Sequence, residues 1–161
     1  MPSILSFCQG LPEREYGAGA VLLVEGEMTG TLYVLISGEV EIVKGEYQVH
    51  MTAEPGAVFG EISALLGIPH TATVRTLGPC RLHVVEDAGV FLQSHPEIAF
   101  CLSRLLAQRL YSVTSYLADL KAQFEDRKDH LGMVDEVLEA LMHHQDEGFT
   151  PGSDRHPDPT L

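Results

Sequence analysis

The sequence predicts an α+β protein in which a roll of short β-strands is followed by a long helix. Between residues 20 and 86, short β-rich runs alternate with glycine turns at a spacing of about ten residues, which is typical of a sandwich or barrel-like β-roll. Beyond residue 95 the apolar residues change to a helical period. The chain has 161 residues, of which 45% are hydrophobic, and this suits one domain with a substantial core.

The first half of the chain is predicted to form one short helix and a series of strands. The helix covers residues 4–9 and ends before Gly10 and Pro12. Residues 40–43 alternate apolar and charged side chains, as a half-buried strand does, and the next three residues form a hairpin-turn sequence around Gly45. The predicted strands cover residues 21–24, 32–36, 40–43, 47–51, 71–75 and 81–85.

The second half of the chain is predicted to be helical. Pro96 can begin a helix, because proline is tolerated in the first turn. Apolar residues then recur every three or four positions, which is the a/d pattern of a coiled coil. This apolar stripe consists of Leu106, Leu110, Val113, Leu117, Leu120 and Phe124. We expect the roll and the long helix within residues 1–125, a short helix within 126–145, and a disordered polar tail over 146–161.

Composition and charge narrow the classes of function. The formal net charge is −13, from 10 Lys and Arg against 23 Asp and Glu, and no block of basic residues occurs. Duplex binding needs clustered cations, so we expect no nucleic-acid partner. No apolar run approaches the roughly 18 residues of a spanning helix, and no signal peptide is evident, so we expect no membrane contact. Cys8, Cys80 and Cys101 have neither zinc-site nor disulfide-framework spacing, which favours a cytoplasmic location.

The segment 59–74 carries the chemistry of the predicted site. Gly60 opens a short apolar helix of about two turns, and the start of a helix presents N–H groups and a positive dipole end that suit an anion. Glu61 can accept a hydrogen bond from a sugar hydroxyl. The Thr71 hydroxyl and the Ala72 backbone N–H can donate to a phosphate oxygen. The segment therefore predicts a site for a small anion with a sugar hydroxyl beside it.

The same segment resembles the phosphate-binding cassette of cyclic-nucleotide-binding domains, through the residues FGEISALL at 59–66. Residues 25–27 and 32–40 resemble the glycine-bracketed strand pair of that family, and the long helix resembles the dimerising C-helix of the Crp/Fnr-like activators. The likeness covers about residues 16–125. It implies a double-stranded β-helix, that is, a jelly-roll-like β-roll with flanking helices and a long C-terminal helix, here without the activators' helix-turn-helix domain.

By this resemblance, the chain is a non-enzymatic regulatory module that binds cAMP or cGMP. Glu61 would bind the ribose 2′-hydroxyl, while Thr71 and Ala72 would contact the cyclic phosphate. The apolar stripe would join two copies in a parallel homodimer, and the signal would pass to an effector protein. No catalytic residue and no metal ligand is expected. The implied ligand-binding residues are Gly60, Glu61, Ile62, Ser63, His70, Thr71, Ala72, Arg109 and Thr114.

Position 70 departs from the family pattern. The family cassette normally has arginine before its Thr/Ser-Ala pair, and this chain has His70. Arginine is always charged, whereas an ordinary imidazole is mostly neutral at pH 7. Loss of a charge-assisted pair would cost about 1.5–3 kcal/mol, or about ten- to a hundredfold in affinity. Arg75 could partly substitute, but on an unbroken strand it would face the opposite side from His70.

Other interpretations of the sequence stay open. A degenerate roll would keep the fold, bind no nucleotide, and act as a dimerisation or protein-interaction module. A metal-dependent enzyme would need His50, His70 and His83 to converge on one ion. A haem or iron sensor would use Cys80 and His83 as ligands.

Overall fold

The computed structural model of the protein describes residues 3–124 and 128–143. The chain divides into two compact units, Met1–Leu102 and Ser103–Leu161. The division falls inside the longest helix, whereas the sequence prediction groups all of that helix with the roll in residues 1–125. The tail predicted over 146–161 lies outside the described residues.

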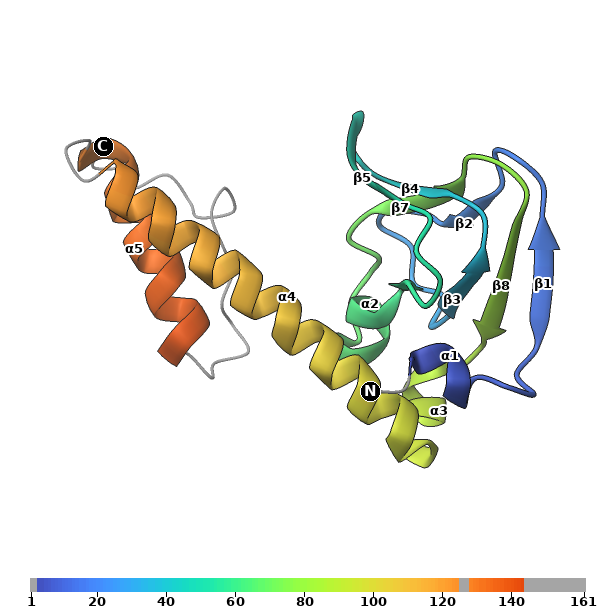
Figure 1. Ribbon diagram of the computed structural model, residues 1–161. Coiled ribbons are helices and arrows are strands. Elements are labelled where there is room, and N and C mark those ends of the chain that lie inside the picture. The colour runs from blue at the N-terminus through green and yellow to red at the C-terminus, as the bar shows by residue number, and fades with distance from the viewer. Residues whose placement is uncertain (1–2, 125–127, 144–161) are drawn as a thin grey trace. The chain divides into compact units, whose positions relative to one another are not determined.

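In the described residues, the first unit contains two four-stranded antiparallel sheets (Figure 1). The chain passes repeatedly from one sheet to the other, as it does in a jelly roll, and this confirms the predicted β-roll. The strand order is β1(Glu13–Tyr16), β8(Cys80–Val85), β3(Leu32–Ser37), β6(Val58–Phe59) in one sheet and β2(Val21–Leu23), β7(Thr73–Thr76), β4(Val40–Lys44), β5(Tyr47–Thr52) in the other.

The core of the roll lies between the two sheets. Leu35, Val40 and Leu82 are fully buried in it. The rings of Tyr16 and Tyr33 meet edge to face, with their centroids 6.4 Å apart. Full burial of a large apolar side chain contributes about 1.5–3 kcal/mol, so this cluster is a large part of what holds the roll together.

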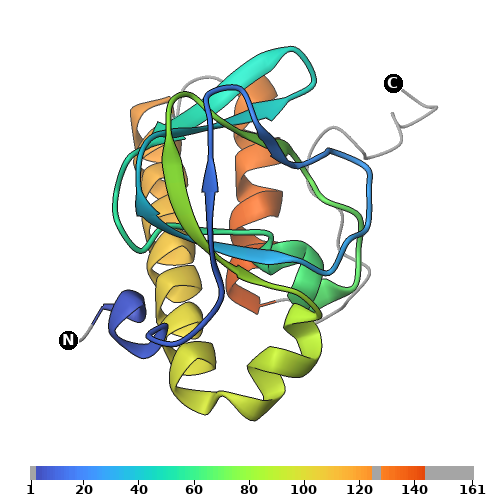
Figure 2. The ribbon, with the colours of Figure 1, turned by 90° about the vertical axis from the view of Figure 1, so that its right-hand side faces the viewer.

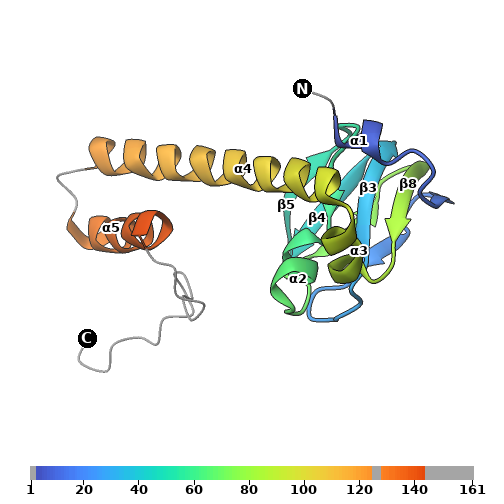
Figure 3. The same cartoon turned by 90° about the horizontal axis from the view of Figure 1, so that it is seen from below.

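Short helices and the start of the long helix gather at one end of the roll (Figures 2 and 3). These elements are α1(Ile4–Phe7), α3(Ala88–Ser94) and the first turns of α4(Pro96–Gln123). On α4, Ile98 and Leu102 are buried. Side chains alternate between the two faces of β3, so Leu32 and Val34 lie on the face opposite the core between the sheets. They are buried as well. Strand β3 is therefore covered on both faces.

The observed elements differ from the prediction in a few places. The N-terminal helix ends at Phe7 rather than at residue 9, and the strand after the cassette begins at Thr73 rather than at residue 71. The remaining predicted strands are confirmed to within one residue at each end. Strands β1 and β6 and helix α3 have no counterpart in the prediction.

Helix α4 continues into the second unit, which also contains α5(Lys128–His143). Lys121 on α4 forms an ion pair with Asp135 on α5. The predicted apolar stripe lies on α4 as far as Leu120, and its last member, Phe124, directly follows the helix. Leu110, Val113 and Phe124 are exposed. Within the residues that the structure describes, no helix combines the length and the apolar content that a membrane crossing requires.

Candidate ligand-binding site

The candidate site begins at helix α2(Glu61–Leu66), which follows strand β6 directly. Gly60 is the N-cap of this helix and has a left-handed backbone, with φ of +90°. A Cβ at this position would collide with the backbone carbonyl oxygen of Thr31 and would also touch Leu23. Only glycine satisfies both constraints, so the chain can begin the helix tightly against the start of β3.

Glu61, the first residue of α2, is buried, with only 6% of its surface exposed. An acid at the start of a surface helix is ordinarily solvated and largely exposed, which Glu61 is not. Glutamate is rarely buried unless it serves a partner or a site. The structure therefore places a carboxyl group inside the fold where the cassette resemblance requires one.

The rest of α2 is fixed by its own short hydrogen bonds. The Ser63 hydroxyl donates to the carbonyl oxygen of Ile68 at 2.5 Å, and the Gly67 N–H donates to the carbonyl oxygen of Ser63 at 2.9 Å. Gly67 ends the helix in a left-handed conformation, as helix-ending glycines commonly do. The Ser63 side chain is thus engaged inside the cassette, which leaves its backbone amide for the predicted ligand role. Ile62 is 40% exposed.

The end of the cassette is tied to the segment between β2 and β3. The Gly26 N–H donates to the His70 carbonyl oxygen at 2.9 Å, and the His70 N–H donates to the Glu27 carbonyl oxygen at 2.8 Å. The His70 Nε2 atom lies 2.7 Å from the Thr29 hydroxyl oxygen. The backbone N–H of Glu25 donates to the hydroxyl oxygen of Thr73, two residues beyond Thr71. This set of bonds fixes where Thr71 leaves the turn.

His70 is the least solvent-exposed of the predicted ligand residues, at 4%. Burial lowers the pKa of its imidazole below the usual value, and the nearby Glu27 carboxylate opposes this effect only in part. The ring is therefore neutral at pH 7 and hydrogen-bonded to the neutral hydroxyl of Thr29. The structure gives this histidine a role in holding the neighbouring segment, which the sequence did not indicate.

The other predicted site residues divide between the two units. Thr71 is exposed and Ala72 is half-buried, directly after His70. Arg109 and Thr114 lie on the part of α4 that belongs to the second unit, where Arg109 is exposed and Thr114 is half-buried. A contact of these two residues with a bound ligand stays a prediction.

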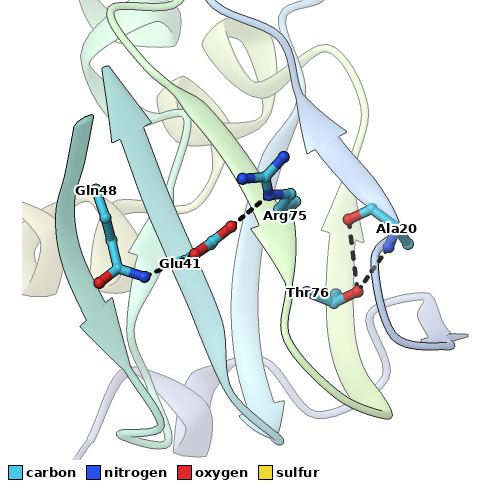
Figure 4. A network of polar contacts seen from close by, with 5 residues as sticks. All are labelled: Ala20, Glu41, Gln48, Arg75 and Thr76. Carbon is cyan, nitrogen blue, oxygen red and sulfur yellow. Dashed lines mark hydrogen bonds and ion pairs between the residues drawn. The ribbon is translucent and has the colours of Figure 1, made fainter. Parts of the chain in front are cut away.

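Arg75 does not compensate for the missing arginine at position 70. It forms an ion pair with Glu41 on the neighbouring strand β4, and the Gln48 side-chain amide donates to the same carboxylate at 2.7 Å (Figure 4). Both hydrogen bonds lower the pKa of Glu41, and the bond from Arg75 has the larger effect. Arg75 is thus committed to the outer polar network of the sheet, on the strand that follows the cassette.

The other arginines of the first unit are also engaged in ion pairs. Residues 1–102 contain four Lys and Arg, and Arg75 is one of three that pair with carboxylates. Arg14 pairs with Glu86 at 3.3 Å and Arg81 with Glu13 at 2.6 Å. Lys44 ends strand β4. The three arginines of the first unit are therefore committed to carboxylates rather than to a phosphate at the cassette.

The geometry does not support the metal interpretations. Across residues 3–124 and 128–143, no three His, Cys, Asp or Glu side chains form a group that could hold a metal ion. His50 lies on β5 in one sheet, whereas His83 lies on β8 in the other. Cys80 and His83 are three residues apart on one strand and so point to opposite faces, which prevents them from ligating one iron.

Two residues of this region were missed by the sequence reasoning. Thr29 and Glu27 contact His70 across about forty residues of sequence. The only signal available in the sequence was the turn composition between Gly26 and Gly30, which marks a loop but does not say where that loop pairs.

Comparison with known proteins identifies the family of domains that shares this fold. Residues 13–91 match the family model of the cyclic nucleotide-binding domain, so this region of the chain belongs to that family. The resemblance found in the sequence is thereby confirmed.

Individual relatives are regulatory and transport-related proteins. The chain is 29% identical over 124 residues to a CRP-like cAMP-activated global transcriptional regulator of Mycobacterium tuberculosis. This match covers 73% of this chain and 55% of the regulator. It is 44% identical over 79 residues to an uncharacterised ABC transporter ATP-binding protein of the same species, covering 47% of this chain and 24% of that protein. The chain thus spans about half of the regulator's length and about a quarter of the length of the transporter protein.

Among solved structures, the catabolite activator protein of Thermus thermophilus has the same fold. The TM-score is 0.61 at 22% sequence identity, and the match covers 75% of this chain and 60% of that chain. This likeness shows a shared β-roll followed by a helix, in agreement with the strand order described above.

Proposed function

We propose that this protein is a non-enzymatic receptor that binds a cyclic nucleotide, cAMP or cGMP, at the cassette and acts in regulation. The observation that carries the proposal is the buried Glu61 at the start of α2, directly behind the left-handed Gly60, inside the region that matches the family. One relative, a CRP-like cAMP-activated regulator, supports the same class of ligand.

Each group in the cassette has a role in this proposal. The Glu61 carboxylate accepts a hydrogen bond from the ribose 2′-hydroxyl. The amides from Gly60 to Ser63 line the ribose and phosphate, because the start of the helix favours negative charge. The Thr71 hydroxyl and the Ala72 N–H donate to the phosphate oxygens.

Binding is expected to be weaker than in a site with an arginine at position 70. A neutral His70 that already contacts Thr29 offers the phosphate no full positive charge. The missing charge-assisted pair corresponds to about ten- to a hundredfold in affinity.

Helix α4 and a partner protein would carry the output of this receptor. The stripe from Leu106 to Phe124 includes side chains that are up to half exposed, such as Val113 at 50%, and a second copy of the chain would cover them in a parallel homodimer. The net charge of −13 opposes a direct contact of these residues with DNA. Three unpaired cysteines agree with a reducing cytoplasm, where the receptor would act on an effector protein.

Isothermal titration of the purified chain with cAMP and with cGMP tests the ligand. We expect saturable binding that is lost in Glu61→Ala and retained in Glu39→Ala, which removes an exposed acid from a turn between strands. Saturable binding that is equally strong in both variants would contradict the role of Glu61.

A degenerate roll is the second candidate, and the buried neutral His70 is the observation that favours it. It predicts no heat with either nucleotide at millimolar concentration. Under the receptor proposal, the wild type binds the nucleotide and His70→Arg increases that affinity by about ten- to a hundredfold. An unchanged circular dichroism spectrum of the variant is the control for its fold.

Dimer formation is tested by sedimentation velocity. Val113→Glu places a charge in the stripe and is expected to give monomers, whereas Gln108→Glu, at an exposed position outside the stripe, is expected to leave the dimer intact. A wild-type chain that sediments as a monomer at every concentration would refute the proposed homodimer.

A further inference from the structure

Two cysteines from distant parts of the sequence lie at the end of the roll where the helices gather. Cys8 directly follows α1 as its C-cap and has no exposed surface. Cys101 lies on α4 and is half-buried, next to Leu102 and three residues after Ile98, both of which are buried. Cys101 is therefore on the side of α4 that packs into the first unit.

The helices that carry these cysteines are neighbours. Figures 1, 2 and 3 all show α1 beside the first turns of α4. Burial raises the pKa of the Cys8 thiol to about 11, and charge on the Cys101 sulfur contributes to the same increase. Coulomb interaction falls with distance, so an effect of this kind agrees with the two sulfurs being close.

We propose that Cys8 and Cys101 form a redox-active pair that closes to a reversible disulfide and links the N-terminal helix α1 to helix α4. Both residues are free thiols in the structure. The third cysteine, Cys80, is separate from them, because it lies in the core between the sheets and its Sγ donates to the carbonyl oxygens of Glu39 and Gly78 at 3.3 Å.

The oxidant in this proposal is a peroxide such as hydrogen peroxide. The more accessible Cys101 thiolate attacks one peroxide oxygen, the O–O bond breaks, hydroxide leaves and a sulfenic acid forms. Cys8 loses its proton, its sulfur attacks the Cys101 sulfur, and the sulfenic hydroxyl leaves as water. Two electrons pass from the two sulfurs to the peroxide, and the products are one disulfide and two molecules of water.

Two consequences follow from the chemistry of the pair. Because few Cys8 side chains are ionised at neutral pH, the second step is slow and accelerates as the pH rises. A closed disulfide would fix the start of α4 on the roll. Its effect on signalling, unlike the disulfide itself, rests on the proposed function of α4 as the output helix.

The test uses the full chain without nucleotide, so its outcome is independent of ligand binding. After treatment with hydrogen peroxide, thiols titrated under denaturing conditions are expected to fall from three to one, with a mass loss of two hydrogen atoms. Peptide mapping is expected to join the peptides of Cys8 and Cys101. Three remaining thiols, or a disulfide joining two chains through Cys101, would overturn the proposal.

Matched variants identify the cysteines that take part. Cys80→Ser is expected to retain the disulfide, whereas Cys101→Ser is expected to abolish it. In Cys8→Ser, the sulfenic acid on Cys101 should persist and react with dimedone. Should a variant fail to fold, dibromobimane on the reduced wild-type chain gives a second measurement, since it becomes fluorescent when it bridges two neighbouring thiols. Bridged peptides that lack Cys8 or Cys101 would also refute the pairing.

Discussion

The substitution Gly60→Ala tests whether the close approach of backbone at the cassette is as tight as the structure indicates. Gly60 and Gly67 flank the same short helix, and both have left-handed backbones, with φ of +90° and +66°. An alanine in such a conformation costs about 1–2 kcal/mol. At Gly67 nothing lies within 4 Å of an added Cβ, so this strain is the whole expected effect.

At Gly60 the added Cβ also overlaps the carbonyl oxygen of Thr31, which is a backbone atom and cannot rotate away. Overpacking of this kind adds about 1–3 kcal/mol. We expect Gly60→Ala to lower the free energy of unfolding by about 3 kcal/mol and Gly67→Ala by about 1 kcal/mol. The difference of about 2 kcal/mol is roughly thirtyfold in the folding equilibrium.

Urea unfolding followed by circular dichroism measures this difference for the wild type and both variants. The two alanine variants share their chemistry and their helix, and differ chiefly in the space available to the new methyl group. Equal destabilisation by the two substitutions would refute the argument that the start of β3 and the start of α2 are in close contact at Gly60.

Three further predictions concern the polar contacts of the first unit. Thr29→Val leaves the buried His70 Nε2 atom without its hydroxyl partner and should lower the free energy of unfolding by about 1–3 kcal/mol in urea; a change below about 0.3 kcal/mol would contradict a stabilising contact. Because burial lowers the pKa of His70 in the folded state, the folded state binds fewer protons, and stability should fall as the pH drops below the ordinary histidine pKa of 6.5. The urea midpoint of His70→Gln should therefore fall less than that of the wild type between about pH 7.5 and 5.5. An equal fall in both proteins would contradict the lowered pKa of His70. The hydrogen bond from Arg75, and secondly that from Gln48, lowers the pKa of Glu41, so the stabilisation by this network is present above the ordinary glutamate pKa and is lost as the pH falls through the folded-state pKa. The stability of Glu41→Gln should therefore depend less on pH than that of the wild type between about pH 5 and pH 3. An equal dependence on pH would show that the pair contributes nothing to stability.

Much of the roll could be predicted because its strands have local signals. The runs in β3, β4 and β8 combine β-branched residues with flanking glycines, and their observed bounds agree closely with the predicted ones. Helix α4 was predictable from its period. Helix α2 was expected from the glycines that bracket it.

The missed elements have no such local signal. Strand β1 is a run of charged residues with one tyrosine, and it becomes a strand because it pairs with β8, where Arg81 forms an ion pair with Glu13. Strand β6 has two residues, too few to show any period. In both cases, the information lies in a partner strand that is distant in the sequence.

The same limit explains what was and was not seen at the candidate site. The chemistry of Gly60 and Glu61 could be inferred, because a glycine followed by an acid at a helix start has a local physical meaning. The engagement of His70 with Thr29, and of Arg75 with Glu41, depends on contacts between separate strands and loops. Those contacts decide how much positive charge reaches a bound phosphate, and the sequence alone does not contain them in readable form.

Amide hydrogen exchange with and without saturating cAMP or cGMP asks most directly whether the cassette is where the ligand binds. If the account is right, nucleotide slows exchange in peptides that span residues 59–74, leaves the exposed strand β5 unchanged, and has no effect in Glu61→Ala. Unaltered exchange across 59–74 at nucleotide concentrations that saturate a measured binding signal would contradict it, because the ligand would then occupy another part of the chain.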